Sequence, residues 1–368
     1  MAPTLALGET EVGMQPSWLP PRLLNLSIPK PRFDAAQRAW GLSIAVYLFL
    51  GGVGAGAFAI AILLGWAGVV LEPLPTTLPG GVEIDLSALL LFWGPLLVAG
   101  DAALLLLHLG RNKHLFVTAG RKPRTAWLSR GFAILICFIC TGGLLLLLAA
   151  LAPGWLSGSP AAWRFLEVAG LLAALATATY TGMLLHSMRQ IPAWHTALLP
   201  PLFVVSALAT GALALALTVW IAHSVGVEAA GAGRLLDATT VAAVALLTIE
   251  AVLVTAYVRA VRRAGRSGER SVLLLLGGTW RAPFWLGVIG LGIISPAVLL
   301  VAAPAVTSPA VALAAVSGLA GGFVLRLSVL GIGIKDSPPL LSLSTWRAEA
   351  VRWPLGGSPG LSPEARAQ

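Results

Sequence analysis

The sequence predicts an all-α integral membrane protein with eight transmembrane helices, and three observations support this fold class. Hydrophobic residues make up 57% of the chain and charged residues only 11%. The mean hydropathy is +0.88, whereas a soluble domain carries about 25% charged residues. The apolar residues also gather into runs that reach the ~20 residues needed to cross a bilayer. A soluble globular class is therefore excluded.

The eight runs lie between a polar, proline-rich N-terminal arm, residues 1–39, and a polar C-terminal tail, residues 335–368. The arm lacks the charged start, short apolar core and small-residue cleavage site of a signal peptide. We expect one transmembrane domain over 40–334, with Pro304 and Pro309 dividing its last uncharged stretch into two helices. The expected spans are 40–71, 86–110, 131–151, 163–187, 196–223, 237–258, 283–303 and 309–334.

Basic residues fall almost entirely on one side of this predicted bundle. All of the 24 lysines and arginines lie on the side of the N-terminus except Arg164, Arg234 and Arg326. Cytoplasmic loops carry the excess of Lys and Arg, so we expect both termini in the cytoplasm. The net charge of +9 is explained by basic residues that set the orientation of the chain in the bilayer. No nucleic acid partner is therefore expected.

Three charged residues stand deep inside the expected spans, away from their ends, namely Asp101, Glu250 and Arg326. Such groups are costly in a membrane and are functional candidates by default. Asp101 and His108 are seven residues apart, close to two helical turns, so they share a helix face. Glu250 and Tyr257 repeat this spacing. We expect Asp101 or Glu250 to accept from Arg326, either along a proton path or as an ion pair that fixes helix order.

Polar residues also gather at the break between the fourth and fifth spans, where Tyr180, His186, Arg189 and His195 lie. This side of the membrane suits a quinone head group, which requires hydrogen-bonding partners, proton donors and an apolar slot. Tyr180 can donate a hydrogen bond and a proton. The other candidates for the site are His108, His186, Arg130, Trp40 and Tyr47.

Other features favour structural roles. Trp40, Trp127 and Trp194 are expected in an interfacial aromatic belt rather than in ring contact with a ligand. Cys137 and Cys140 are expected to be buried, because they lie in an apolar helix. Thr141 rather than His follows Cys140, which excludes a c-haem motif. The glycines Gly51, Gly52, Gly54 and Gly56 form a small-residue face for helix packing.

Four stretches resemble the NrfD/polysulfide-reductase membrane-subunit family. They are YLFLGGVGAGAF (47–58), HLGRNKHLF with PRTAWLSRG (108–131), YTGMLLHSMRQIPAWHTALLPPLFVVSALATG (180–211) and GGFVLRLSVLGIG (321–333). The resemblance implies an eight-helix, haem-free, quinone-reactive subunit in a bacterial or archaeal cytoplasmic (inner) membrane. It also implies a ferredoxin-like iron–sulfur partner subunit that is usually wired to a molybdopterin oxidoreductase subunit.

The resemblance also assigns roles to single residues. Tyr180 matches the family tyrosine beside the quinone, and Asp101 matches the carboxylate of the second span. Ser43 and Val46 stand where, in the polysulfide-reductase type, polar residues of the first span approach the quinone, so this chain departs from the pattern at Val46. His108 replaces a frequent carboxylate and His195 a frequent asparagine. In the polysulfide-reductase type the quinone side faces the periplasm. The count of Lys and Arg places the equivalent side of this chain in the cytoplasm, so the expected orientation is reversed. We therefore expect a cytoplasmic iron–sulfur partner that docks on the loops 111–130 and 189–195.

These observations predict a non-autonomous subunit of a quinone-linked oxidoreductase that uses menaquinone or ubiquinone. Tyr180 is expected to contact the head group, with Asp101 in proton delivery and no metal or haem in this subunit. Two alternatives stay open. One is a secondary transporter with a coupling site at Asp101, Glu250 and Arg326, although no internal repeat is visible. The other is a b-haem anchor that uses His108 and His186, the one pair at matched depth.

Overall fold

The computed structural model describes residues 41–69, 75–77, 83–109, 127–151, 159–226, 231–302 and 306–335. This part of the chain contains eight helical spans long and apolar enough to cross a membrane, so the predicted multi-pass, all-α fold is confirmed. The helices are α1 (Leu42–Trp66), α2 (Leu86–Leu109), α4 (Trp127–Leu151), α6 (Pro160–His186), α7 (Leu199–Ser224), α8 (Ala232–Arg263), α9 (Arg266–Leu276), η2 (Pro283–Ile294), α10 (Ser295–Ala302) and α11 (Pro309–Gly331).

Helix α1 is the centre of the bundle. It contacts α2, α6, α7 and α11, and most of its residues are buried. Glycines make this central position possible, because a Cβ on Gly56 would collide with the backbone carbonyl of Ala207 in α7. Small residues of this kind let membrane helices approach closely. The predicted glycine face of the first span therefore does serve helix packing.

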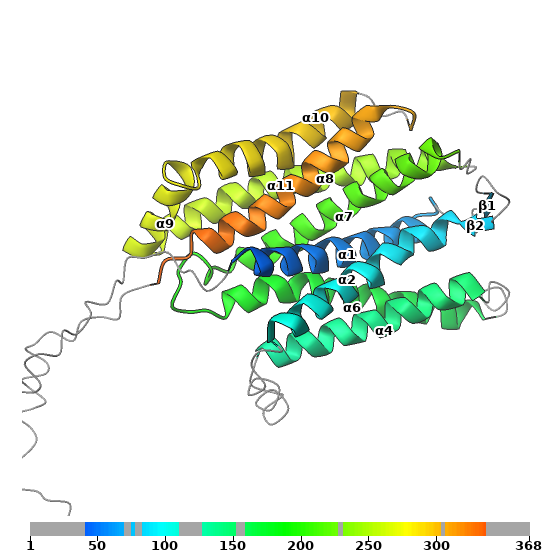
Figure 1. Cartoon of the computed structure of the whole chain (residues 1–368), viewed down its shortest axis with the longest axis horizontal. Coiled ribbons are helices and arrows are strands. Elements are labelled where there is room, and N and C mark those ends of the chain that lie inside the picture. The colour runs from blue at the N-terminus through cyan, green and yellow to red at the C-terminus, as the bar shows by residue number, and fades with distance from the viewer. Residues whose placement is uncertain are drawn as a thin grey trace, which may run out of the picture. The chain divides into compact units, whose positions relative to one another are not determined.

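The remaining helices form two groups around α1 (Figure 1). On one side, α4 packs against α2 and α6, and both of these pack against α1. On the other side, α7, α8, α11 and the η2–α10 span pack together. Contacts of α7 with α1 and α6 join the two groups. Each group contributes one buried polar cluster, as described below.

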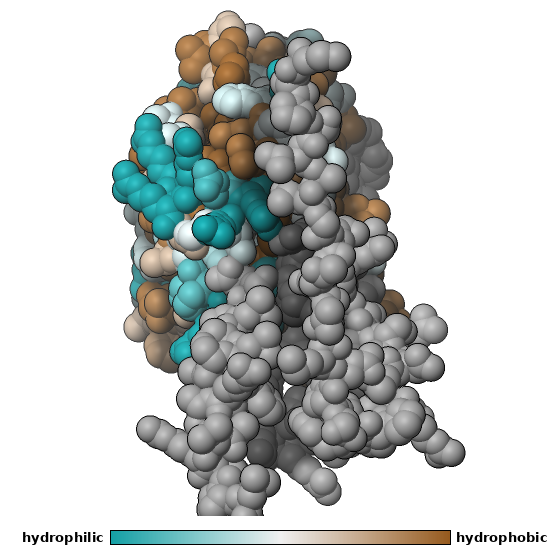
Figure 2. Space-filling view, turned by 90° about the vertical axis from the view of Figure 1, so that its left-hand side faces the viewer, coloured by the Kyte–Doolittle hydropathy of each residue, from teal (hydrophilic) through white to brown (hydrophobic). Residues whose placement is uncertain are grey.

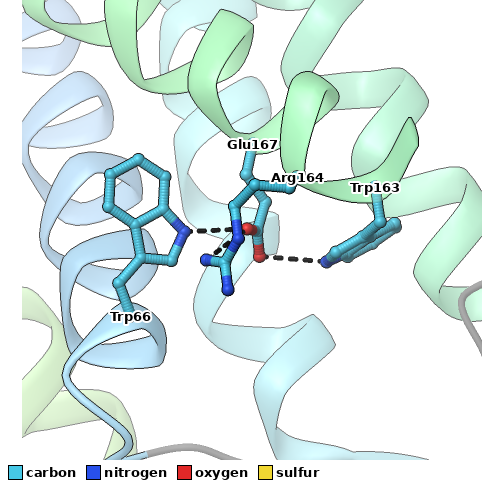
Figure 3. A network of polar contacts seen from close by, with 4 residues as sticks. All are labelled: Trp66, Trp163, Arg164 and Glu167. Carbon is cyan, nitrogen blue, oxygen red and sulfur yellow. Dashed lines mark hydrogen bonds and ion pairs between the residues drawn. The ribbon is translucent and has the colours of Figure 1, made fainter. Parts of the chain in front are cut away.

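A polar clasp ties α1 to α6 at the end of the bundle where α1 finishes (Figure 3). The carboxylate of Glu167 accepts hydrogen bonds from Nε1 of Trp66 at 2.7 Å and from Nε1 of Trp163 at 2.9 Å. Nη1 of Arg164 donates a third at 3.0 Å, and its guanidinium carbon lies 5.4 Å from the centroid of the Trp66 ring. The clasp lies at the end of α1, whereas the polar clusters lie toward its beginning.

Three features of the fold are absent from the sequence prediction. A short antiparallel ribbon, β1 (Pro75–Thr77) with β2 (Glu83–Asp85), pairs Thr76 with Ile84 between the first two spans. The amphipathic helix α9 follows α8 and buries Val272 and Leu275. The seventh span begins as a π-helix over Pro283–Ile294 before it continues as α10.

The expectation that both cysteines are buried is wrong. Cys137 and Cys140 are free thiols exposed on the outer face of α4. They lie one turn apart, so both fall on the apolar surface that a helix at the edge of a membrane bundle presents to lipid. The N-terminal arm 1–39, Trp40 and the tail beyond Lys335 lie outside the described residues.

Candidate functional site

A first cluster of buried polar side chains lies between α1, α2 and α6. Tyr47, Asp101 and Tyr180 are all buried, with 8%, 3% and 5% of their surface exposed. The three side chains are close enough to interact electrostatically, Tyr47 with both of the others and Tyr180 with Asp101. Asp101 lies eight residues from the end of α2, or about 12 Å. Tyr180 lies six residues from the end of α6, so the cluster occupies the half of the bundle in which α1 begins.

Two glycines make space for this cluster. A Cβ on Gly51 of α1 would collide with the Asp101 carboxylate, and a Cβ on Gly131 of α4 would collide with the phenol ring of Tyr180. The ring therefore lies directly against the α4 backbone. Arg130 is the residue before Gly131 and is exposed, so the start of α4 carries a guanidinium next to the tyrosine contact.

Two polar atoms of the first cluster make no hydrogen bond to any described residue. They are Oη of Tyr180 and Oδ1 of Asp101, and both are buried. Buried polar atoms are nearly always hydrogen-bonded, so an unsatisfied one demands an explanation. Tyr180 offers one donor and Asp101 an acceptor or, when protonated, a donor. Both atoms are therefore available to a polar group that the described residues do not supply.

A second buried cluster lies across α1, among α7, α8 and α11. Arg326 is fully buried, and its Nε donates to the carbonyl oxygen of Leu48 at 3.3 Å. Its Nη1 donates to Oγ of Ser206 at 3.2 Å and to the carbonyl oxygen of Gly322 at 2.8 Å. Phe49 and Phe203 flank the guanidinium, with ring centroids 5.5 Å and 5.7 Å away.

Glu250 of α8 completes the second cluster. It is 4% exposed and interacts electrostatically with Arg326. Its carboxylate also faces the Ser206 hydroxyl, which therefore lies between the two charges. Of the two acceptors proposed for Arg326, the structure favours Glu250 over Asp101. The expectation that a carboxylate accepts directly from Arg326 is corrected. The hydrogen bonds of its guanidinium group go to two backbone carbonyls and a serine hydroxyl.

The glycine pair of α1 separates the two clusters. Gly51 lies against Asp101, whereas a Cβ on Gly52 would stand only 2.6 Å from Nη2 of Arg326. Nη2 has no hydrogen-bond partner in the described part of the chain. Successive residues on a helix point about 100° apart. The adjacent residues Gly51 and Gly52 therefore face different clusters, and only the backbone of α1 lies between the two clusters at this point.

The break between α6 and α7 brings two histidines together. The rings of His186 and His195 stack with centroids 4.6 Å apart. Nδ1 of His195 lies 2.7 Å from the carbonyl oxygen of His186, and Nδ1 of His186 lies 3.1 Å from that of Thr196. A carbonyl oxygen can only accept, so both Nδ1 atoms carry the hydrogen.

Neighbouring helices hold this break in place. Oη of Tyr257 donates to the carbonyl oxygen of Ala193 at 2.8 Å, and Nε1 of Trp194 donates to that of Val329 at 2.7 Å. The expectation that Trp194 belongs to an interfacial belt is wrong. It is 1% exposed, because its ring packs against Gly333 and its Nε1 bonds to the backbone of α11.

Comparison with known proteins decides the family. A family model described as "Polysulphide reductase, NrfD" matches residues 32–335 of this chain. The chain belongs to the NrfD family. A curated relative, the C subunit of the polysulfide reductase of Wolinella succinogenes, is 30% identical over 192 residues. That alignment covers 47% of this chain and 55% of the relative, so the chain spans about half the length of the curated relative that it matches.

The structure brings together part of the site expected of this NrfD-family chain. Tyr180, Asp101 and Tyr47 lie in one cluster. Ser43 is exposed and stands one helical turn before Tyr47, so it shares that face of α1. His186 is half-buried and its contacts are with His195 and Thr196.

Other predicted residues are less fully placed. His108 lies in α2, two turns after Asp101, but its side chain lies outside the described residues. Trp40 lies outside them as well. Glu250 and Arg326 lie together in the second cluster, apart from Asp101 and across the α1 glycines.

Two residues of the buried clusters, Ser206 and Gly131, are not among the residues predicted from the sequence. Ser206 is a fully buried serine in the apolar stretch of α7, and Gly131 makes the ring contact with Tyr180. Ser206 could have been noticed as a hydroxyl inside an apolar span. Gly131 has no such signal, because its importance depends on which helix packs opposite.

Proposed function

We propose that this NrfD-family chain is the quinone-reactive membrane anchor of a respiratory oxidoreductase complex. The buried cluster of Tyr47, Asp101 and Tyr180 supports this proposal most directly, because two of its polar atoms have no partner among the described residues. The donor and acceptor types fit a menaquinone or ubiquinone head group. When bound, a quinone carries two electrons and two protons between the membrane and the complex.

The residues of the first cluster have distinct tasks in this proposal. Tyr180 donates a hydrogen bond from Oη to a quinone carbonyl. Asp101 is the group proposed to deliver protons, because it is a buried carboxyl group close enough to Tyr180 to interact with it electrostatically. Tyr47 and the Gly131 backbone position the Tyr180 ring. Arg130 and His108 are the further polar groups expected at the entrance.

Proton movement through the second cluster is an extension of the same proposal. Glu250 and Arg326 are buried ionisable groups in a membrane span, which commonly mark proton relays. Ser206 lies between them and can pass a proton as both donor and acceptor. The unpaired Nη2 of Arg326 faces Gly52, next to the glycine that touches Asp101.

The proposed partners follow from the family. A ferredoxin-like iron–sulfur subunit docks on the side of the membrane where α1 begins, and a molybdopterin oxidoreductase subunit completes the complex. Arg189 and His195 are exposed at the α6–α7 break, which Tyr257 and Trp194 hold in position. Such a fixed polar loop suits protein docking. Both termini are assigned to the cytoplasm of a bacterium or archaeon.

The test removes one oxygen atom. Tyr180→Phe keeps the ring against Gly131 but deletes Oη. In the purified complex with its native subunits, we expect quinol turnover to fall by about 10²-fold, the scale of losing a positioned proton donor. Thr218→Val is the control, because it also removes one oxygen atom, a hydroxyl that bonds within α7 to Ala214, outside the cluster and the α6–α7 break.

Two outcomes would contradict the proposal. Unchanged turnover in Tyr180→Phe would remove this tyrosine from the mechanism. If the complex neither binds nor turns over a quinone analogue, the transporter alternative at Asp101, Glu250 and Arg326 becomes the better account. A visible spectrum of the same preparation tests the b-haem alternative.

A further inference from the structure

The end of α8 that leads into α9 carries a cavity rich in arginine. Arg259, Arg262 and Arg263 line it together with Glu269 of α9, and its volume is about 450 Å³. All four side chains are exposed. Three guanidinium groups and one carboxylate leave the cavity with a net charge of +2. None of these four residues belongs to either buried cluster.

The walls of this cavity are fixed by close packing of α9 on α8. A Cβ on Gly268 would collide with the carbonyl oxygen of Val261, so the two helices touch at this point. Val272 and Leu275 of α9 are buried against the bundle. Figure 2 views the end of the bundle where α9 lies and shows hydrophilic side chains gathered in a patch bordered by hydrophobic ones.

A continuous outward stripe of α8 leads from this cavity into the membrane. Thr248, Val252, Thr255 and Arg259 follow a spacing of three or four residues and are all exposed. The two threonine hydroxyls bond to their own helix, Thr248 to Val244 at 2.8 Å and Thr255 to Ala251 at 2.9 Å. The stripe therefore presents methyl groups, and Val252 is 64% exposed.

The length of the stripe matches one leaflet of a bilayer. Thr248 and Arg259 are eleven residues apart, which is about 16 Å along an α-helix. Half of a hydrocarbon core is about 15 Å. An acyl chain laid along the stripe would thus bring its head group to the level of the arginines.

We propose that this cavity binds the phosphodiester head group of an anionic phospholipid, with an acyl chain along the α8 stripe. Guanidinium groups bind phosphate oxygens with paired hydrogen bonds. Basic pockets at the ends of membrane helices are suited to lipids that carry two phosphates, and the net charge of +2 matches two phosphodiesters. The apolar stripe favours a lipid over an acidic protein, because a docked soluble partner would leave it uncovered.

The test measures lipid binding by the complex, purified with its native subunits and placed in nanodiscs, with diphosphatidylglycerol as the probe and phosphatidylcholine as the neutral lipid. Arg262→Gln with Arg263→Gln removes two charges from the cavity. We expect the dissociation constant for diphosphatidylglycerol to rise about thirty-fold. Arg281→Gln, an exposed arginine outside the cavity, is the matched control and should leave it unchanged.

The unmodified protein provides an independent measurement if the double variant fails to insert. Its preference for diphosphatidylglycerol over phosphatidylcholine should weaken as salt rises, because the site is exposed to screening. Equal binding of both lipids would overturn the proposal. Displacement of the lipid by millimolar inorganic phosphate would assign the cavity to a free anion instead. Loss of partner subunits from the double variant, with lipid binding unchanged, would assign it to protein docking.

Discussion

The second cluster yields a prediction about energetic coupling. Arg326→Leu removes the three hydrogen bonds to Leu48, Ser206 and Gly322. Each contributes about 0.6–1.5 kcal/mol. The substitution also leaves the buried Glu250 carboxylate facing an apolar side chain. Removing one partner of a buried charge pair costs about 3–5 kcal/mol in total, and we expect a loss of unfolding free energy of that size.

Glu250→Gln in the Arg326→Leu background tests the pairing. Once the guanidinium is gone, the carboxylate is a liability, so its removal should restore part of the lost stability. We expect a coupling free energy of about 1–3 kcal/mol between the two positions. The measurement is a double-mutant cycle of unfolding free energies, obtained by titrating the micelle-solubilised protein with sodium dodecyl sulfate and following tryptophan fluorescence.

Asp101→Asn provides the control cycle with Arg326→Leu. Asp101 belongs to the first cluster, and the backbone of Gly51 and Gly52 separates it from the guanidinium. Its effect should add to that of Arg326→Leu within about 0.5 kcal/mol. Full additivity between Glu250 and Arg326, or coupling of Asp101 as strong as that of Glu250, would refute the assignment of the pair.

Three further predictions concern other contacts. Gly131→Ala should lower quinol turnover by up to about 10²-fold, because its methyl group displaces the Tyr180 ring and a shift of ~1 Å is enough. Gly143→Ala in the same helix meets open space and should leave turnover intact in the same assay. Glu167→Ala should lower the unfolding free energy by about 1–2 kcal/mol by opening the clasp, with turnover unchanged; a fall in turnover would mean that the two ends of the bundle are linked. Trp194→Phe should lower stability by about 1–3 kcal/mol, since it leaves the Val329 carbonyl buried without its donor. Equal melting temperatures for Trp194→Phe and the parent would show that this bond contributes nothing.

The spans could be predicted from the sequence because hydrocarbon thickness imposes a minimum length on each apolar run. The observed α2 (Leu86–Leu109) and α11 (Pro309–Gly331) begin at the predicted residues. The helix α9 escaped prediction since eleven residues are too few to stand out as a span. The π-helical start of the seventh span could not be predicted, because its amino-acid composition does not differ from that of an apolar α-helix.

The buried candidates could also be named in advance, but their grouping could not. Asp101, Glu250 and Arg326 are conspicuous because ionisable groups are costly inside a membrane. The sequence left open which carboxylate meets Arg326. Trp194 and Cys137 were assigned to the wrong environments, since an aromatic or a thiol in an apolar run gives no sign of the direction it faces.

By itself, the sequence determined the membrane class, the eight spans, the family and the list of ionisable side chains inside the bilayer. These properties depend on local composition and on the distance that a helix must cross. Only the tertiary structure decided that Tyr180 and Asp101 share one side of α1 while Glu250 and Arg326 share the other. That division depends on how neighbouring helices rotate and how closely glycines let them approach, and neither is written in any single helix.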